Sequence, residues 1–355
     1  MTTRKDIAQK AGVSVSVVSR ALNNSGYVEA SKKERILRIA EELGYHPNPV
    51  AVSLMTQRTK QILFYCREIR NAFNLELYEG MVKAAKEQDY LVMFHGSLDF
   101  KSIRSTMVDG IIFPSEAAAE IYQNMVGKIY RLPAVSAAFG NTFYYPKGMP
   151  MIECDCWKGM ELIFQYLRER GHHRIALVMP YDISHEEIRI FAWKDQIQYE
   201  LKKDEIDTYY LGISKKSLPG DKRVLEFGEE REEGDPYIAE NFWGKGRLAA
   251  HIFQERRLDA TAVICFNDEM AMGFLQEIQK LGYRVPENLS IVSFDGTFVR
   301  RYGNPILTSL SLQPEKIGEK CVEILLKEIN KEPFKYKYKL TPRLLEGESV
   351  QKIKR

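Results

Sequence analysis

Three side chains near the start of the chain could read the edges of DNA bases. A valine can contact the methyl group of thymine, a serine hydroxyl can donate to or accept from either base type, and an arginine can donate two hydrogen bonds to guanine. Val15, Ser16 and Arg20 supply these groups within one short segment. To act on one groove, they must lie on the exposed face of a single helix.

The surrounding residues predict two short helices joined by a tight turn. Thr3 can cap the first helix, and Asp6 lies in its first turn, where negative charge is favoured. Gly12 can end this helix because glycine tolerates a positive φ. The Ser14 hydroxyl can cap a second helix that begins at about Val15. This helix-turn-helix can place the N-terminal turn of its second helix in the major groove.

A third helix completes a small core. We expect it to open at Ser31, with Glu34 three residues later in a capping box, and to stop at Gly44. Polar side chains around the three helices suit phosphate oxygens, which position a protein on DNA without reading sequence. These phosphate candidates are Thr3, Ser14, Ser19, Asn23, Tyr27, Ser31 and Asn48.

The charge distribution supports DNA binding, but only weakly. Residues 1–60 hold 10 Lys and Arg against 5 Asp and Glu, whereas the whole chain has a net charge of +3. The basic charge is therefore concentrated in the first segment. Surface lysines are usually only solvated, and the same helix spacing occurs in ordinary helical hairpins.

From residue 61 onward, short apolar runs alternate with helical stretches. Buried parallel strands are expected at 62–66, 91–94, 110–113 and 134–137, and again at 175–178, 262–265 and 291–294. Helices are expected at 75–86, 158–170 and 268–281. Two consecutive βαβ series predict two doubly wound parallel-sheet α/β lobes. Such lobes bind small ligands at the carboxyl ends of their strands, in the cleft between them.

Several segments resemble the LacI-type (lac repressor and purine repressor) family of bacterial transcriptional regulators. The N-terminal matches are 6–8, 11–14, 18–23, 45–48 and 51–54, and those downstream are 71–73, 109–112, 171–176, 267–271 and 290–295. The resemblance implies a repressor with a helix-turn-helix domain and a periplasmic-binding-protein-like core. On this basis we expect a DNA-binding domain at 1–46 and a hinge at 47–60. The N-terminal lobe would comprise 61–167 and 312–330, and the C-terminal lobe 168–311 and 331–355.

The resemblance also implies a set of effector contacts. These are Phe73, Asp155, Arg189, Trp193, Asn267 and Asp295. Guanidinium, carboxylate and amide groups could fix the hydroxyls of a sugar ring, and an aromatic face could stack on its C–H side. Trp193 could instead be a core residue, and Asp295 could cap a turn. Segment 142–146 has no counterpart in the family and 215–235 is a charged insertion, so the effector's identity stays open, as does the choice between inducer and corepressor.

The hinge segment suggests how effector and DNA are coupled. A helix of two or three turns is shorter than the roughly 12–15 residues that hold helicity alone in water, so the isolated segment should be mostly disordered. In a homodimer on a pseudo-palindromic operator, two such helices could pack together. The resemblance makes Leu54 the side chain that wedges between base pairs in the minor groove. An effector that changes the angle between the lobes would bias this folding.

Other classes of protein fit the sequence less well. A P-loop, a Gly-x-Ser-x-Gly elbow and a His-Glu-x-x-His motif are all absent, and the glycines of 244–246 follow a poor strand, so we expect neither an enzyme nor a cofactor. Cys154 and Cys156 lack a second ligand pair at zinc spacing, so no metal is expected. A stand-alone transport protein would need an export signal. The chain has none, nor a membrane-length apolar run, so a cytoplasmic location is expected.

Overall fold

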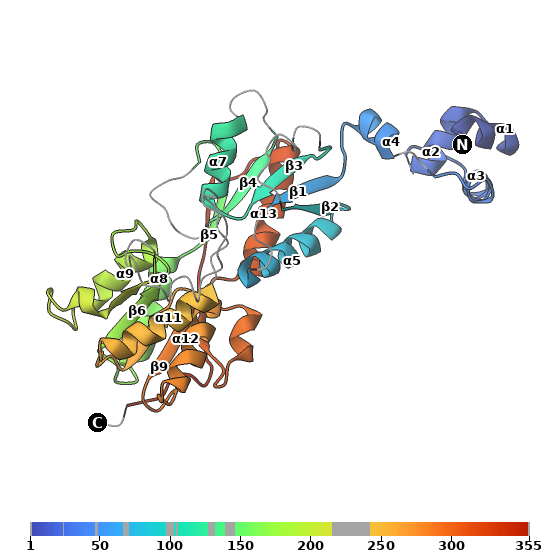
Figure 1. Ribbon diagram of the computed structural model, residues 1–355. Coiled ribbons are helices and arrows are strands. Elements are labelled where there is room, and N and C mark those ends of the chain that lie inside the picture. The colour runs from blue at the N-terminus through green and yellow to red at the C-terminus, as the bar shows by residue number, and fades with distance from the viewer. Residues whose placement is uncertain are drawn as a thin grey trace. The chain divides into compact units, whose positions relative to one another are not determined.

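The computed structural model describes residues 2–23, 25–46, 49–66, 71–96, 103, 106–126, 132–138, 146–214 and 242–353. The chain divides into two compact units, Met1–Thr59 and Lys60–Arg355 (Figure 1). The division falls at the end of the expected hinge, and each unit is described by itself.

The described residues of the first unit form four helices. They are α1 (Arg4–Ala11), α2 (Val15–Asn23), α3 (Ala30–Glu42) and α4 (Pro49–Thr56). Thr3 is the N-cap of α1 and Asp6 lies in its first turn, as expected, the two forming a capping box, and Gly12 ends the helix with φ at 61°. Buried side chains of α1, α2 and α3 form the core, namely Ile7, Ala8, Ala11, Val18, Ala21, Ile36, Ile39 and Ala40. The predicted helix-turn-helix and third helix are confirmed.

The predicted capping box on the third helix is wrong. The N-cap of helix α3 is Glu29, two residues before Ser31, and it makes no side-chain cap hydrogen bond. Because Ser31 already lies inside the first turn, its hydroxyl donates back to the Glu29 carboxylate at 2.8 Å. Ser31 therefore remains exposed but takes no part in capping.

The second unit holds two six-stranded sheets. The first has the order β11-β5-β4-β3-β1-β2, all parallel. Its strands are β1 (Gln61–Tyr65), β2 (Leu91–His95), β3 (Gly110–Phe113), β4 (Ala134–Ala138), β5 (Met151–Cys154) and β11 (Lys337–Leu340). Helices of this first lobe are α5 (Ala72–Lys86), α7 (Glu116–Val126) and α13 (Pro314–Ile329).

The second sheet has the order β12-β10-β9-β8-β6-β7, and only β12 runs antiparallel. Its strands are β6 (Ile175–Met179), β7 (Tyr210–Gly212), β8 (Ala262–Cys265), β9 (Ser290–Asp295), β10 (Thr308–Ser311) and β12 (Arg343–Leu345). Helices of this second lobe are α8 (Cys156–Arg168), α9 (Ile188–Ile197), η1 (Ile206–Tyr209), α11 (Phe242–Glu255), α12 (Asp268–Lys280) and η2 (Phe298–Tyr302). The two predicted parallel-sheet lobes are confirmed.

The lobe boundaries differ from the expected ones. Helix α8, expected in the N-terminal lobe, packs on α9 and β12 of the second lobe (Figure 1). Strand β11, expected in the C-terminal lobe, pairs with β5 of the first sheet. The chain therefore crosses between lobes at Asp155, at 312–313 and at 341–342. The apolar pattern predicted the helix at 158–170 but not the sheet against which it packs, and it predicted no strand at 337–340.

Two glycines allow α11 and α12 to cross in contact. A Cβ atom added to Gly246 would lie 2.0 Å from the Met270 carbonyl oxygen, and one on Gly273 would lie 1.9 Å from that of Trp243. The glycines at 244–246 therefore lie inside a helix that packs closely on its neighbour.

We expect Gly246→Ala to lower the free energy of unfolding by about 1–3 kcal/mol, because α11 must move away from α12 to admit the methyl group. Urea denaturation of the full chain measures this change. A free energy within about 0.5 kcal/mol of the wild type would contradict the close approach.

Candidate DNA-binding and effector sites

The first residues of α2 present the three predicted base-reading side chains to solvent. Val15 is 41% exposed, which is unusual for a valine in a small packed domain. Ser16 and Arg20 are exposed as well. Val18 and Ala21 hold the opposite face of the helix in the core. The outer face of α2 therefore offers an apolar, a hydroxyl and a guanidinium group.

The phosphate candidates fall into two groups. Asn23, Tyr27 and Ser31 are exposed, with Tyr27 at 89%. The hydroxyls of Thr3, Ser14 and Ser19 have partners within the unit, in Asp6 (2.8 Å), Ser16 (2.8 Å) and Arg4 (3.1 Å) respectively. Asn48 lies outside the described residues.

Helix α4 exposes apolar side chains. Leu54 is 73% exposed, Met55 69% and Val50 51%. Among the described residues of the first unit, the hydrophobic core contains no side chain of α4. The segment forms an eight-residue helix on which these three apolar side chains are mostly exposed in the described part of the unit.

In the second lobe, buried polar groups gather where the strands end. Arg189 is 3% exposed, and its Nε donates to the Glu187 carboxylate at 2.7 Å. The same carboxylate accepts from the Arg189 backbone N–H at 2.9 Å, and a second guanidinium nitrogen donates to the Phe266 carbonyl at 2.9 Å. The guanidinium carbon lies 3.8 Å from the centre of the Phe266 ring. Arg189 is thus held rigidly, and Glu187, which the sequence reasoning missed, is its main partner.

Asp295 lies near Arg189, and Asp268 lies near Asp295. Burial and the neighbouring charge of Asp268 raise the pKa of Asp295 well above its usual range, although Arg189 opposes this. Burial also raises the pKa of Asp268, while hydrogen bonds from Ser293, Ser309 and Thr297 lower it. Asp295 has φ at 91°, in the left-handed region. A protonated Asp295 could donate as well as accept a hydrogen bond, which suits a hydroxyl-rich ligand.

The other effector candidates have structural roles. Asn267 caps α12 by accepting from the Met270 N–H at 2.9 Å, and Asp155 caps α8 by accepting from the Lys158 N–H at 3.0 Å. Phe73 is 2% exposed and belongs to the hydrophobic core. Asn267 nevertheless lies directly after Phe266, beside Arg189.

The predicted effector contact through Trp193 is wrong. Its side chain is fully buried, and its indole N–H donates to the Ile175 carbonyl at 3.2 Å. Both the ring and its one polar group are therefore used in packing α9 against β6, so Trp193 is a core residue.

An aromatic cluster beside Arg189 was not predicted. Tyr181 stacks on His185 with ring centres 4.3 Å apart, and it meets Phe266 edge-on at 5.6 Å. Phe242 lies 5.2 Å from Phe266. Tyr181 and Phe266 each come just after a buried strand, and this position was the available signal in the sequence.

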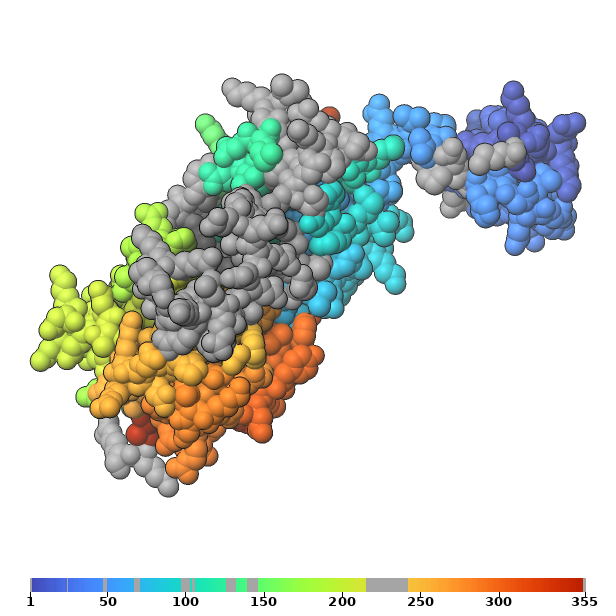
Figure 2. All heavy atoms as spheres, in the orientation of Figure 1, coloured from blue at the N-terminus to red at the C-terminus, as the bar shows by residue number. Residues whose placement is uncertain are grey.

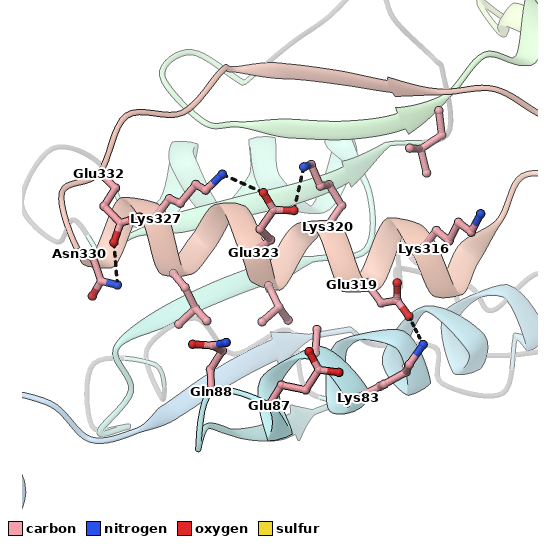
Figure 3. Close-up of a pocket in the computed structure, with 14 residues that line it drawn as sticks. Lys83, Glu87, Gln88, Lys316, Glu319, Lys320, Glu323, Lys327, Asn330 and Glu332 are labelled. Carbon is pink, nitrogen blue, oxygen red and sulfur yellow. Dashed lines mark hydrogen bonds and ion pairs between the residues drawn. The ribbon is translucent and has the colours of Figure 1, made fainter.

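A pocket of about 630 Å³ lies elsewhere, between α5 and α13 (Figure 3). Ion pairs occupy its walls, joining Lys83 to Glu319 at 2.5 Å and joining both Lys320 and Lys327 to Glu323 at 2.8 Å. None of the predicted effector contacts lines it. The pocket is therefore a separate surface feature of the first lobe.

The described residue ranges contain no cluster of three or more side chains able to ligate a metal. Burial raises the pKa of Cys154 to about 12, which keeps this thiol protonated. Within these ranges no helix combines the length and apolar character that crossing a membrane requires. Segments 142–145 and 215–235, where the sequence departs from the family pattern, lie outside the described residues.

Comparisons with known proteins agree with this arrangement. Residues 3–48 match the family described as bacterial regulatory proteins of the lacI family, and residues 164–350 match the periplasmic binding protein-like domain. The repressor PurR of Vibrio vulnificus is 27% identical, and the alignment covers 99% of this chain and 100% of PurR. The regulator RegA of Clostridium saccharobutylicum is also 27% identical, with coverages of 98% and 99%.

Solved structures share the fold. The lac repressor dimer bound to operator and the anti-inducer ONPF has a TM-score of 0.74 at 20% identity, covering 99% of each chain. A complex of the regulator CelR with cellobiose has a TM-score of 0.63 at 21% identity, covering 98% of this chain and 100% of CelR. A regulator from Enterococcus faecium with bound ribose has a TM-score of 0.61 at 20% identity, covering 83% of this chain and all of that one.

Proposed function

Because the chain belongs to the lacI family of bacterial regulatory proteins, which are DNA-binding transcriptional repressors and not enzymes, we propose that a small molecule bound between its lobes switches its affinity for operator DNA. The observation that carries the switch is the convergence of Arg189, Asp295 and Asn267 at the strand ends of the second lobe. Polar groups at this position are typical of ligand sites in doubly wound folds.

The proposed effector is a carbohydrate. Arg189 is already paired with Glu187, so the site offers little net positive charge to an anionic ligand. Asp295 and the aromatic rings of Tyr181 and Phe266 suit hydroxyls and C–H faces. Two structural relatives hold cellobiose and ribose, which supports the same class.

The proposed operator contacts are those of the first unit. Val15, Ser16 and Arg20 read bases, and the exposed polar side chains around them contact phosphates. Leu54, exposed on α4, is the proposed minor-groove wedge. Packing of two α4 helices in a homodimer would cover the apolar residues that α4 exposes.

The proposed dimer also uses the first lobe. Strand β2 is an edge strand, and it exposes Leu91 (60%) and Phe94 (40%) beside Val82 (40%) of α5. Exposed apolar side chains along a sheet edge are typical of a surface that pairs with a partner. We place the homodimer in the cytoplasm, where operator DNA is available.

A two-part experiment tests the proposal on the purified full chain. Selection from fragmented genomic DNA should enrich one pseudo-palindromic sequence, and light scattering should give the mass of a dimer. A panel of sugars, nucleobases and sugar phosphates should then contain a neutral sugar that raises the unfolding temperature, because a ligand at about 100 times its Kd adds about 2.7 kcal/mol of stability.

The two parts can fail separately. Enrichment of an operator without stabilisation by any sugar would overturn the carbohydrate effector and leave the repressor intact. Retention of random fragments alone would overturn the operator assignment.

A further inference from the structure

Two hydrogen bonds join the lobes at the starts of helices. The N–H of Ala72, the first residue of α5 in the first lobe, donates to the Glu269 carboxylate of α12 in the second lobe at 3.0 Å. The N–H of Phe298, the first residue of η2 in the second lobe, donates to the Glu76 carboxylate of α5 at 2.7 Å. The first N–H groups of a helix have no partner within it. Each lobe thus supplies the acceptor for the first N–H of a helix in the other lobe.

From this reciprocity we propose that Glu76 and Glu269 form a latch that holds the two lobes in one arrangement and must break when they rotate apart. Figures 1 and 2 show α5, in cyan, meeting the orange elements of the second lobe at this boundary. Both hydrogen bonds span long sequence separations, so only relative motion of the lobes can break them together.

The helices that carry the latch are rigidly mounted. A Cβ on Gly80 of α5 would lie 2.0 Å from the Glu315 carbonyl oxygen of α13, and one on Gly318 would lie 2.1 Å from that of Leu77. Helix α12 is held as closely against α11 through Gly273. Close-packed helices do not deform gradually. A lobe rotation is therefore transmitted directly to the two carboxylates.

The latch is connected to the proposed effector contacts. Asn267, Asp268 and Glu269 are consecutive at the start of α12. The Asp268 carboxylate accepts from the backbone N–H of Thr297 at 2.6 Å and from its hydroxyl at 2.8 Å. Because Thr297 precedes Phe298, the start of η2 moves with α12. A ligand at Asn267 and Asp295 would act within a few residues of both latch bonds, and this consequence rests on the proposed function.

The carboxylate of Glu76 lies among like charges. It faces Glu79 on its own helix, Glu315 of α13 and Asp268 of α12, while Arg300 and Arg301 lie on η2 and Glu269 on α12. Burial and these carboxylates raise the pKa of Glu76 to about 7, against the opposing effect of the Phe298 N–H. A proton binds more tightly when the latch is closed, so closure gains stability as pH falls through 7 and loses it as pH rises above 7.

Spin labels can measure the latch without DNA or effector. All five native cysteines are buried, so labels introduced by Met125→Cys on α7 and Tyr199→Cys in the second lobe, which are 59% and 74% exposed, can be attached selectively. Pulsed electron-spin distances then report the separation of the lobes. At pH 6 we expect Glu76→Ala and Glu269→Ala each to raise the ratio of open to closed molecules about tenfold, because each variant leaves a helix-start N–H of the closed form without its acceptor.

Glu87→Ala is the matched control, since it removes an exposed carboxylate at the C-terminal end of α5, away from Glu76, and should leave the distances unchanged. In the parent chain, lowering the pH from about 8 to 6 should shorten the mean distance, and Glu76→Gln should abolish this response. Superimposable distance distributions for the parent, Glu76→Ala and Glu269→Ala would overturn the latch. A pH response that persists in Glu76→Gln would show that Glu76 is not part of the latch. Neither result bears on operator selection, so the latch and the proposed function fail independently.

Discussion

Arg20→Ala is expected to weaken operator binding by roughly 2–6 kcal/mol, because a dimer loses one bidentate guanine contact worth about 1–3 kcal/mol in each half-site. The structure supports the choice of residue. Arg20 is exposed on the outer face of α2, while Val18 and Ala21 beside it are buried. Removing its side chain beyond Cβ should therefore leave the fold of the unit unchanged.

Fluorescence anisotropy on the selected operator measures this loss, and a second operator with one base pair changed in each half-site tests the specificity. The parent should bind the selected operator more tightly than the changed one. Arg20→Ala should bind both operators with the same affinity. Arg38→Ala is the matched control, because this arginine of α3 is also well exposed, at 71%. Uniform weakening on every DNA sequence would show that Arg20 contacts phosphate instead of a base.

Glu187→Ala is expected to lower the free energy of unfolding by about 3–5 kcal/mol, because it leaves a buried arginine without its counter-ion. Glu187 is fully buried and Arg189 is 3% exposed, so water cannot replace the lost carboxylate. The variant also removes the acceptor of the Arg189 backbone N–H. Urea denaturation, followed by circular dichroism and by tryptophan fluorescence, measures the change.

An exposed pair provides the control. Glu161→Ala breaks the surface ion pair with Lys158, whose side chain is 53% exposed, and should change the unfolding free energy by less than about 1 kcal/mol. The combined substitution Glu187→Leu with Arg189→Met should recover much of the stability, because it removes both charges together. If Glu187→Ala and Glu161→Ala lowered the free energy of unfolding by the same amount, burial of Arg189 would not depend on its ion pair with Glu187.

Local sequence was sufficient to predict the first three helices and the strands that are continuous apolar runs. The cap at Thr3, the acidic first turn at Asp6, the stop at Gly12 and the apolar stripes of the three helices concern contacts between near neighbours in the chain, and these were predicted correctly. The same holds for the apolar runs that became β1, β3, β6, β8 and β9. The error at Ser31 arose because Glu29, two residues before it, is the N-cap and accepts from the Ser31 hydroxyl.

The candidate effector site could be predicted only in part. Arg189, Asn267 and Asp295 gather at the strand ends of the second lobe, as the βαβ pattern implies. Trp193 was placed there wrongly, because its spacing relative to Arg189 cannot show that the ring packs on β6 and donates to Ile175. Glu187 was missed because an acidic residue two positions before an arginine is common on any surface. Its full burial is a property of the folded lobe.

By itself, the sequence determined the first three helices, the apolar runs that form β1 to β4, β6, β8 and β9, and the order in which a DNA-reading unit precedes two α/β lobes. Only the tertiary structure decided that β11 joins the first sheet, that α8 belongs to the second lobe, and that Glu76 and Glu269 each cap a helix of the opposite lobe. The physical reason is that the periodicity of apolar residues shows how apolar one face of an element is, but not which other element packs against that face. Contacts between residues about 200 positions apart depend on how the whole chain closes on itself.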